Sequence, residues 1–250
     1  MKLKGKVAIV VGGGRNVGEG VAQRFAKEGA KVCIFDNDKG RADTVVAALK
    51  AAGGEAMAVV GNVALPEDAK RTVLAVTERW GQLDILVNCA AISDRKGLLD
   101  LPDEEWRETL DVTLSGSYYF MRHAAIQMVK QGKGGAIVNF SAGSAFAGSA
   151  HRIAYDAAKG AVVSMTMSAA VQLTKHGIRV NAISPGIVGS QVGGRTAPAD
   201  RKFTNLLGRI TMPEHMANVV LFLVSDEGEH VIGQCIKVDA GSSVMPWFSA

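Results

Sequence analysis

The chain has 250 residues, of which 48% are hydrophobic and 21% are charged. This composition predicts a chain that buries a sizeable core, and it excludes intrinsic disorder, which needs fewer apolar residues and more net charge. The formal net charge is +4, from 28 basic and 24 acidic residues dispersed singly along the chain. We therefore expect no nucleic-acid partner, because nucleic-acid binding requires a concentrated positive face.

Apolar, β-branched runs alternate with segments of helical period along the chain. The predicted strands are Val7–Val11, Lys31–Phe35, Ala56–Val60, Asp84–Val87, Ala136–Phe140, Arg179–Ile183 and Gln234–Val238. The predicted helices are Val17–Glu28, Lys39–Ala51, Pro66–Trp80, Asp103–Val129, Ala154–Thr174 and Pro213–Val224. Continuous apolar strands are typical of parallel sheets covered on both faces. The sequence therefore predicts a doubly wound α/β fold with a seven-stranded parallel sheet.

Membrane, metal and redox features are sparse. No uncharged apolar stretch approaches the ~20 residues needed to span a bilayer, and the first residues show no signal-peptide cleavage region. The three cysteines lie far apart in apolar runs, and the five histidines form no i,i+4 pair. We expect a cytoplasmic protein with reduced, buried thiols, no membrane partner and no metal.

A glycine-rich turn follows the first predicted strand and leads into a helix, with Gly12, Gly14 and Gly18 as its spaced glycines. Such a turn lets backbone N–H groups and a helix N-terminus face a pyrophosphate. Asp36 ends the second strand, where a carboxylate accepts hydrogen bonds from both adenosine ribose hydroxyls and repels a 2′-phosphate. The alternative is that Asp36 caps the next helix, a role that a neighbouring Asp or Asn would fill equally well.

The spacing of these glycines resembles the T-G-x-x-x-G-x-G turn of the short-chain dehydrogenase/reductase family in its single-domain form. Further motifs follow in the family's order along the chain. Asn88–Ala91 is similar to N-N-A-G, Tyr155–Lys159 to Y-x-x-x-K, and Asn181–Gly186 to N-x-x-x-P-G. The resemblance implies one Rossmann-type NAD(P)-binding domain over residues 1–250. It also implies a homotetramer assembled through the two longest predicted helices, whose apolar runs could equally be core.

Tyr155 and Lys159 are one helical turn apart, so their side chains project from one helix face. A nearby ammonium favours the phenolate and lowers the pKa of the tyrosine. The resemblance implies that Tyr155 is the general acid/base and that Lys159 also binds the nicotinamide ribose.

Two partners that the family adds to this pair are replaced. Ala142 stands at the position of the serine that holds the substrate oxygen, and Thr113 stands at that of the asparagine that orders a water. Ser144 and Ser141 are alternative replacements for the serine, and strand alternation favours Ser144. Thr113 keeps a hydroxyl that would bind the water.

The family pattern assigns a larger set of residues to the cofactor. They are Gly12, Gly14, Arg15, Asn16, Val17, Gly18, Asp36, Asn62, Val63, Asn88, Ala90, Tyr155, Lys159, Pro185, Gly186, Val188 and Ser190. Val11 and Asn16 depart from the family's threonine and middle glycine, although asparagine tolerates positive φ. Arg15 favours NADP and Asp36 favours NAD. We expect NAD, because a carboxylate beside a 2′-phosphate is directly repulsive whereas an arginine can turn to solvent.

The expected substrate contacts are Ile92, Ala142, Ser144, His151 and Ile187. A loop at about 186–208 is long for a connection and is predicted to cover the substrate, while His151 either contacts substrate or faces solvent. A mostly apolar lining predicts a hydrophobic or cyclic secondary alcohol and its ketone. We expect an NAD(H)-dependent oxidoreductase. The alternatives are a cofactor-binding scaffold or sensor with eroded catalysis, and a non-redox enzyme on the same fold.

Overall fold

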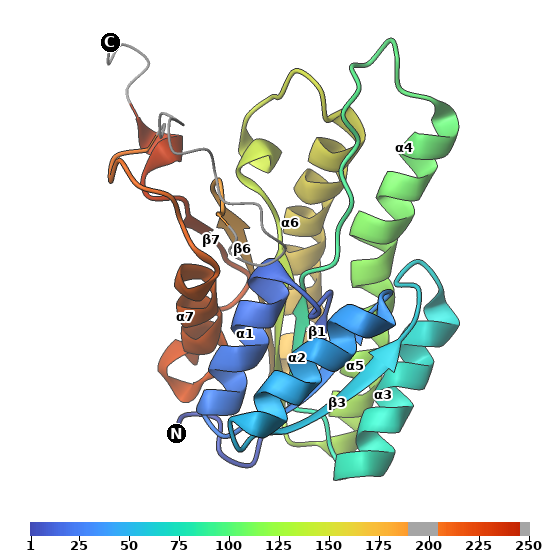
Figure 1. Ribbon diagram of the computed structural model, residues 1–250, viewed down its shortest axis with the longest axis vertical. Helices are drawn as coiled ribbons and strands as arrows, with labels where there is room; N and C mark the ends of the chain where they lie inside the picture. Colours follow the sequence, from blue (N-terminus) through green and yellow to red (C-terminus); the bar gives the residue numbers. More distant parts are fainter. Residues whose placement is uncertain (190–204, 246–250) are drawn as a thin grey trace.

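The computed structural model describes residues 1–189 and 205–245. Seven parallel strands form one sheet in the order β3-β2-β1-β4-β5-β6-β7, as Figure 1 shows in part. The strands are β1 (Val7–Val11), β2 (Lys31–Asp36), β3 (Glu55–Val60), β4 (Ile85–Asn88), β5 (Gly135–Phe140), β6 (Ile178–Pro185) and β7 (Cys235–Val238). The predicted Rossmann-type, doubly wound fold in a single domain is confirmed.

Helices cover both faces of this sheet (Figure 1). They are α1 (Asn16–Lys27), α2 (Lys39–Ala51), α3 (Pro66–Trp80), α4 (Asp103–Leu110), α5 (Gly116–Gln131), α6 (Ile153–Leu173) and α7 (Pro213–Val224). The bounds of α2, α3 and α7 equal the predicted ones. Each of these helices has an unambiguous start: Asp38 caps α2 by accepting the Arg41 N–H, and a proline opens each of the other two.

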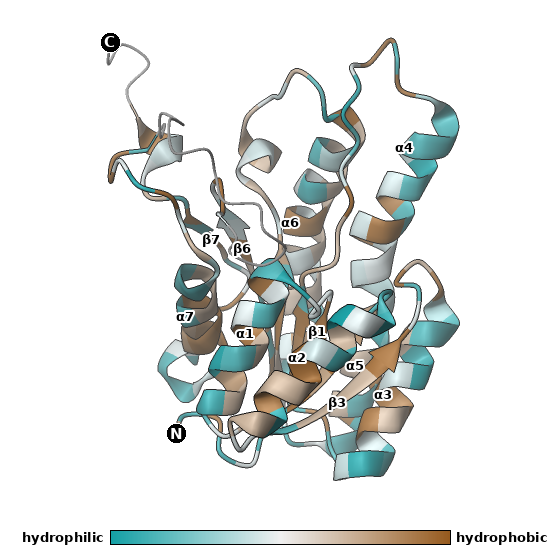
Figure 2. Ribbon diagram, viewed as in Figure 1, coloured by the Kyte–Doolittle hydropathy of each residue, from teal (hydrophilic) through white to brown (hydrophobic). Residues whose placement is uncertain are grey.

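Alternation along the strands divides the apolar side chains between two cores. In β1, Ala8 and Val10 pack with α1, α2 and α7 on one face, whereas Val7, Ile9 and Val11 pack with α3, α5 and α6 on the other. In Figure 2 the visible strand β3 has hydrophobic colours, and hydrophilic residues lie on the helices, among them α1 and α4. Because both faces are covered, the strands contain continuous apolar runs.

The helix predicted over Asp103–Val129 is wrong as a single element. It is broken into α4 and α5 by a π-helical turn over Asp111–Ser115. The π turn inserts an extra residue without changing the apolar pattern enough to be seen in the sequence. It contains Thr113, one of the predicted site residues.

The strand order reverses between β1 and β4, so the connections that leave these two strands diverge to opposite sides. A crevice at the carboxyl ends of the strands is the usual ligand site of this topology. The Gly-rich turn, the end of β4 and the start of α6 all meet there. Among the described residues, no helix is both long and apolar enough to cross a membrane.

Candidate active site

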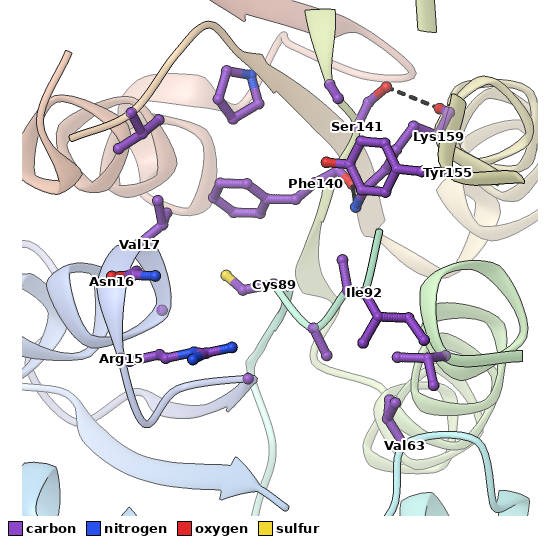
Figure 3. A pocket seen from close by; sticks show the side chains of 18 of the residues that line it. Arg15, Asn16, Val17, Val63, Cys89, Ile92, Phe140, Ser141, Tyr155 and Lys159 are labelled. Atoms are coloured by element: carbon purple, nitrogen blue, oxygen red, sulfur yellow. Dashed lines mark hydrogen bonds between the residues drawn. The ribbon is translucent and has the colours of Figure 1, made fainter. Parts of the chain in front are cut away.

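A cavity of about 1520 Å³ opens at the carboxyl ends of the strands. Figure 3 shows Arg15, Asn16 and Val17 at the start of α1 on one side of it, and Tyr155 and Lys159 from α6 on the other. Ordinary small-molecule pockets measure ~300–1,000 Å³, so this cavity has room for a dinucleotide together with a second ligand.

Most of the predicted site residues line this cavity. They are Gly12, Arg15, Asn16, Val17, Gly18, Asp36, Asn62, Val63, Ala90, Ile92, Ala142, Ser144, Tyr155, Lys159, Pro185, Gly186, Ile187 and Val188. Gly14, Asn88, Thr113 and His151 are not among the lining residues, and Ser190 lies outside the described residues. His151 is exposed to solvent.

The glycines of the turn are required by close packing. A Cβ on Gly12 would lie 2.8 Å from the Ala90 nitrogen, and one on Gly18 would overlap the Gly12 carbonyl oxygen. Asn16 takes the left-handed conformation with φ of 51°, so the turn accepts asparagine where the family has glycine. The side chain of Arg15, which precedes α1, forms no capping hydrogen bond to its first turn. A helix N-terminus of this kind suits the pyrophosphate of a dinucleotide.

Asp36 lies at the end of β2 and is 6% exposed. Its Oδ2 accepts the Gly14 N–H at 3.0 Å, and its Oδ1 accepts the Asp38 N–H at 3.1 Å. Oδ1 also forms an ion pair with Arg41 Nη2 at 3.1 Å. The cap of α2 is Asp38, not Asp36. The Asp36 carboxylate is therefore held by the protein, and Oδ2 keeps a lone pair for a ribose hydroxyl.

Sequence reasoning missed Arg41 and several other charged residues of the lining. The acidic ones are Glu104, Glu108, Asp111 and Asp239, and the further basic ones are Arg95, Arg107 and Arg152. The prediction of a mostly apolar lining is therefore wrong for the cavity as a whole, and apolar surface is found around Ile92, Ala142 and Ile187. The only sequence signal for Arg41 was its place in the first turn of the helix that follows Asp36.

Asn62 and Val63 form the wall beyond β3. The Asn62 side-chain carbonyl accepts the Ala64 N–H at 3.0 Å, which shapes the turn that they occupy. Gly116 lets α5 pack tightly here, because a Cβ at that position would lie 2.6 Å from Val63 Cγ2.

Asn88 instead stabilises the sheet. It is buried, and its Nδ2 donates to Asn139 Oδ1 at 2.8 Å and to the Ser117 carbonyl at 3.2 Å.

Tyr155 and Lys159 reach the cavity from one face of α6 (Figure 3). Lys159 is 2% exposed, and its Nζ donates to the Phe140 carbonyl at 2.6 Å. That nitrogen lies 5.6 Å from the centre of the Tyr155 ring. The phenol hydroxyl has no hydrogen-bond partner among the described residues.

Burial governs the ionisation of both groups. It lowers the pKa of Lys159 to about 8 because the charged ammonium is removed from water. Burial also raises the pKa of Tyr155, and this effect exceeds the opposing attraction of Arg152. The prediction that the ammonium lowers the pKa of the tyrosine is therefore wrong.

The two candidate serines differ in their hydrogen bonds. Ser141 is buried, and its hydroxyl donates to the Lys159 backbone carbonyl at 2.9 Å, the dashed line in Figure 3. Ser144 lies in a short 3₁₀ turn (Gly143–Phe146) on the cavity wall. Its hydroxyl oxygen is buried without a partner among the described residues. Buried hydroxyls normally find a partner, so a polar ligand group would suit Ser144.

Thr113 is fully buried in the π turn and contacts the loop after β4. Its Oγ1 donates to the Ile92 carbonyl at 3.0 Å and accepts the Ile92 N–H at 3.2 Å. The single O–H donor of Thr113 is thus engaged by the carbonyl of Ile92, a residue that lines the cavity.

This sheet, with its crevice at the strand-order reversal, defines a Rossmann-type α/β protein. The comparisons with known proteins narrow the class. A family model described as enoyl-(acyl carrier protein) reductase matches residues 12–243. The chain belongs to the short-chain dehydrogenase/reductase family of oxidoreductases.

Relatives and solved structures match over nearly the whole chain. A galactitol 2-dehydrogenase of Agrobacterium fabrum is 35% identical over 97% of this chain and 99% of that protein. An L-rhamnose 1-dehydrogenase (NAD(P)(+)) of a Sphingomonas species is 36% identical over 97% and 98% of the two chains. The crystal structure of a short-chain dehydrogenase/reductase from Mycobacterium marinum, 30% identical, covers 98% of this chain and 97% of its own with a TM-score of 0.91.

Proposed function

We propose that this protein is an NAD(H)-dependent oxidoreductase that interconverts a hydrophobic or cyclic secondary alcohol and its ketone. The observation that carries the proposal is that Tyr155 and Lys159 face the Gly-rich turn and Asp36 across a single cavity. The Gly-rich turn suits the pyrophosphate, and Asp36 Oδ2 suits the adenosine ribose. The ammonium of Lys159 suits the second ribose. These residues fit a nicotinamide dinucleotide.

The chemistry divides between the cofactor and the chain. A nicotinamide held by these residues would supply the hydride acceptor for oxidation of the carbinol carbon and the hydride donor for reduction of the carbonyl carbon. As the phenolate, Tyr155 takes the alcohol proton during oxidation, and as the phenol it gives a proton to the carbonyl oxygen during reduction. The Lys159 ammonium stabilises the phenolate, and Ser144 orients the substrate oxygen by donating its unpaired hydroxyl.

The apolar part of the cavity lining supports the substrate class. Ile92, Ala142 and Ile187 supply apolar surface for a carbon chain or ring. The names of the galactitol and L-rhamnose dehydrogenases support a substrate with an oxidisable hydroxyl. We further propose that the enzyme is a cytoplasmic homotetramer. Most of the loop predicted at about 186–208 lies outside the described residues.

The deciding experiment screens the purified protein with NAD against a panel of cyclic and open-chain secondary alcohols, following NADH absorbance. We expect sustained NADH formation with at least one member. Tyr155→Phe should abolish this turnover and leave NAD affinity nearly unchanged, because the ring packing stays and only the transferable proton is lost. A variant that keeps more than a few per cent of the rate, by the same assay, would move the acid/base role elsewhere.

A second candidate function rests on Ala142, which replaces the family's serine. A protein that had lost catalysis would still bind NAD and act as a scaffold or sensor. Such a protein would bind NAD in calorimetry but form no NADH with any alcohol of the panel. The proposed enzyme would bind NAD and also form NADH.

A further inference from the structure

The helix that carries Tyr155 does not cap its own N-terminus. α6 begins at Ile153, and the preceding Arg152 forms no side-chain hydrogen bond to the first turn. The second and third N–H groups of a helix, here those of Ala154 and Tyr155, normally need such a partner because no intrahelical carbonyl reaches them. Another part of the chain must therefore satisfy them.

Asp94 supplies the missing acceptor from the loop between β4 and α4. Its Oδ1 accepts the Tyr155 N–H at 2.9 Å, and its Oδ2 accepts the Ala154 N–H at 3.3 Å. The side chain is 6% exposed and 61 residues away from Tyr155 along the chain. A carboxylate at a helix N-terminus is also favoured by the helix dipole.

The same loop is held at a second point. Two residues before Asp94, the Ile92 backbone exchanges two hydrogen bonds with Thr113 in the π turn. Ile92 lines the cavity, as Tyr155 does. In Figure 1 this loop runs along the N-terminal end of α6. The segment from Ile92 to Asp94 thus connects the π turn, one cavity wall and the backbone of the tyrosine.

We propose that Asp94 is a positioning residue, whose two hydrogen bonds set the place of Tyr155 relative to the cavity wall at Ile92. This inference rests on the proposed oxidoreductase function. Asp94 itself does not line the cavity, so it acts through the tyrosine and not on substrate. Small displacements of a reacting group reduce turnover strongly while leaving binding largely intact.

Asp84 provides a matched control. It is also a buried aspartate whose carboxylate accepts two hydrogen bonds, from the Val7 N–H at 2.7 Å and from Gln82 Nε2 at 2.9 Å. It lies immediately before β4, at the end of the sheet opposite the cavity. Asp84→Asn should therefore lower stability without changing kcat.

The test compares Asp94→Ala, Asp94→Asn and Asp84→Asn with the wild type. We expect kcat to fall about tenfold to a hundredfold in Asp94→Ala, with the alcohol KM and the NAD Kd changed by less than about twofold. Asp94→Asn keeps one acceptor oxygen, folds more readily and should lose less. Equal kcat in wild type and both Asp94 variants, or an equal loss in Asp84→Asn, would overturn the proposal.

A local cap separates helix capping from positioning. Arg152→Ser places a capping hydroxyl at the start of α6. The double variant Arg152→Ser/Asp94→Ala is compared with Arg152→Ser alone. Arg152 lines the cavity and acts on the pKa of Tyr155, so the kcat of the double variant is judged against that of Arg152→Ser alone. Relative to Arg152→Ser, we expect the double variant to recover thermal stability but not kcat, because the link to the Ile92 loop stays broken. Full recovery of kcat would reduce Asp94 to an ordinary cap and overturn the positioning role.

Hydrogen exchange gives a readout independent of turnover. The peptide that contains Tyr155 should exchange faster in Asp94→Ala than in wild type. In Asp84→Asn, the same peptide should exchange at the wild-type rate. A wild type inactive on every alcohol, with this exchange difference present, would refute the proposed function and leave the contact established. An active wild type with unchanged exchange and kcat in Asp94→Ala would refute the inference alone.

Discussion

Asp36 serves the protein as well as a candidate cofactor. The ion pair with Arg41 occupies Oδ1 and offsets the charge of the Asp36 carboxylate, and Arg41 lines the cavity, as Arg15 does. The carboxylate that should repel a 2′-phosphate is thus partly neutralised by an arginine that would attract one. We therefore expect the choice between NAD and NADP to depend on this pair and not on Asp36 alone.

The Asp36–Arg41 pair leads to a prediction about cofactor preference. We expect the wild type to bind NAD at least about tenfold more tightly than NADP, which is roughly 1.4 kcal/mol. Arg41→Ala should widen the gap, because it leaves Asp36 uncompensated and removes a phosphate partner. Titration of both oxidised cofactors measures the ratio, with Lys39→Ala as a control on the exposed side of the same helix. Equal or tighter NADP binding by the wild type would contradict it.

The hydroxyl of Ser144 is buried on the cavity wall without a partner among the described residues, and this supports its use toward substrate. Ser144→Ala should lower kcat by roughly ten- to a thousandfold with little change in NAD affinity. Ala142→Ser should partly restore activity in the double variant by supplying the family's serine. Unchanged kcat in Ser144→Ala would show that another group orients the substrate oxygen.

Lys159 makes stability depend on pH. Burial lowers its pKa to about 8 from a usual 10.5, so the unfolded chain binds more protons between these two values. Burying the charged lysine therefore lowers the free energy of unfolding by its full amount below pH 8. This destabilisation decreases as the pH rises toward 10.5. Relative to Lys159→Met, the wild type should gain about 3 kcal/mol of unfolding free energy over this range.

Denaturant titrations of both proteins at several pH values measure the gain. Phe140 loses its hydrogen bond in the variant at every pH, so this cost cancels in the pH dependence. A difference between the two proteins that stays constant with pH would show that Lys159 keeps its usual pKa.

At the scale of elements, the π turn between α4 and α5 positions a loop. The Thr113 hydroxyl holds the Ile92 backbone twice, because it donates to the Ile92 carbonyl and accepts the Ile92 N–H. Thr113→Val should lower the unfolding free energy by about 2 kcal/mol, because it leaves a backbone N–H and C=O without their partner. Thr113→Ser keeps the hydroxyl and should stay close to wild type in denaturant titration. A loss of kcat in Thr113→Val at unchanged stability would instead support a water-binding role for the hydroxyl.

At the scale of the whole molecule, α5 and α6 present apolar side chains to solvent. Tyr118 and Ile126 on α5 and Met167 and Val171 on α6 are exposed, Val171 by 82%. Exposed apolar surface on two helices is what an interface between identical chains would bury. These side chains support assembly through α5 and α6.

The native mass tests this assembly. Light scattering should give four times the mass of one chain for the wild type. Val171→Glu should give a smaller species, because it places a charge in the interface. Leu74→Glu on α3 is the control, since Leu74 is 49% exposed on a different helix. A monomeric wild type would contradict the predicted homotetramer.

The sequence by itself determined the sheet, several of the helices that cover it and most of the residues that line the cavity at its carboxyl edge. Continuous apolar runs and caps are local signals, so β1, α2, α3 and α7 were predicted with their observed bounds. The Gly-rich turn was equally predictable, because the close approach of Gly12 to Ala90 permits no side chain.

Only the tertiary structure decided the partners of the side chains. The Arg41 ion pair, the Thr113 contact with Ile92 and the Asp94 cap of α6 join segments whose contact no periodicity reveals. The same is true of the tyrosine pKa, which depends on how deeply α6 buries Tyr155 and not on the spacing to Lys159. Spacing along one helix places two ionisable groups on the same face. Their pKa values are set by burial and hydrogen bonds, which arise only when distant segments of the chain pack together.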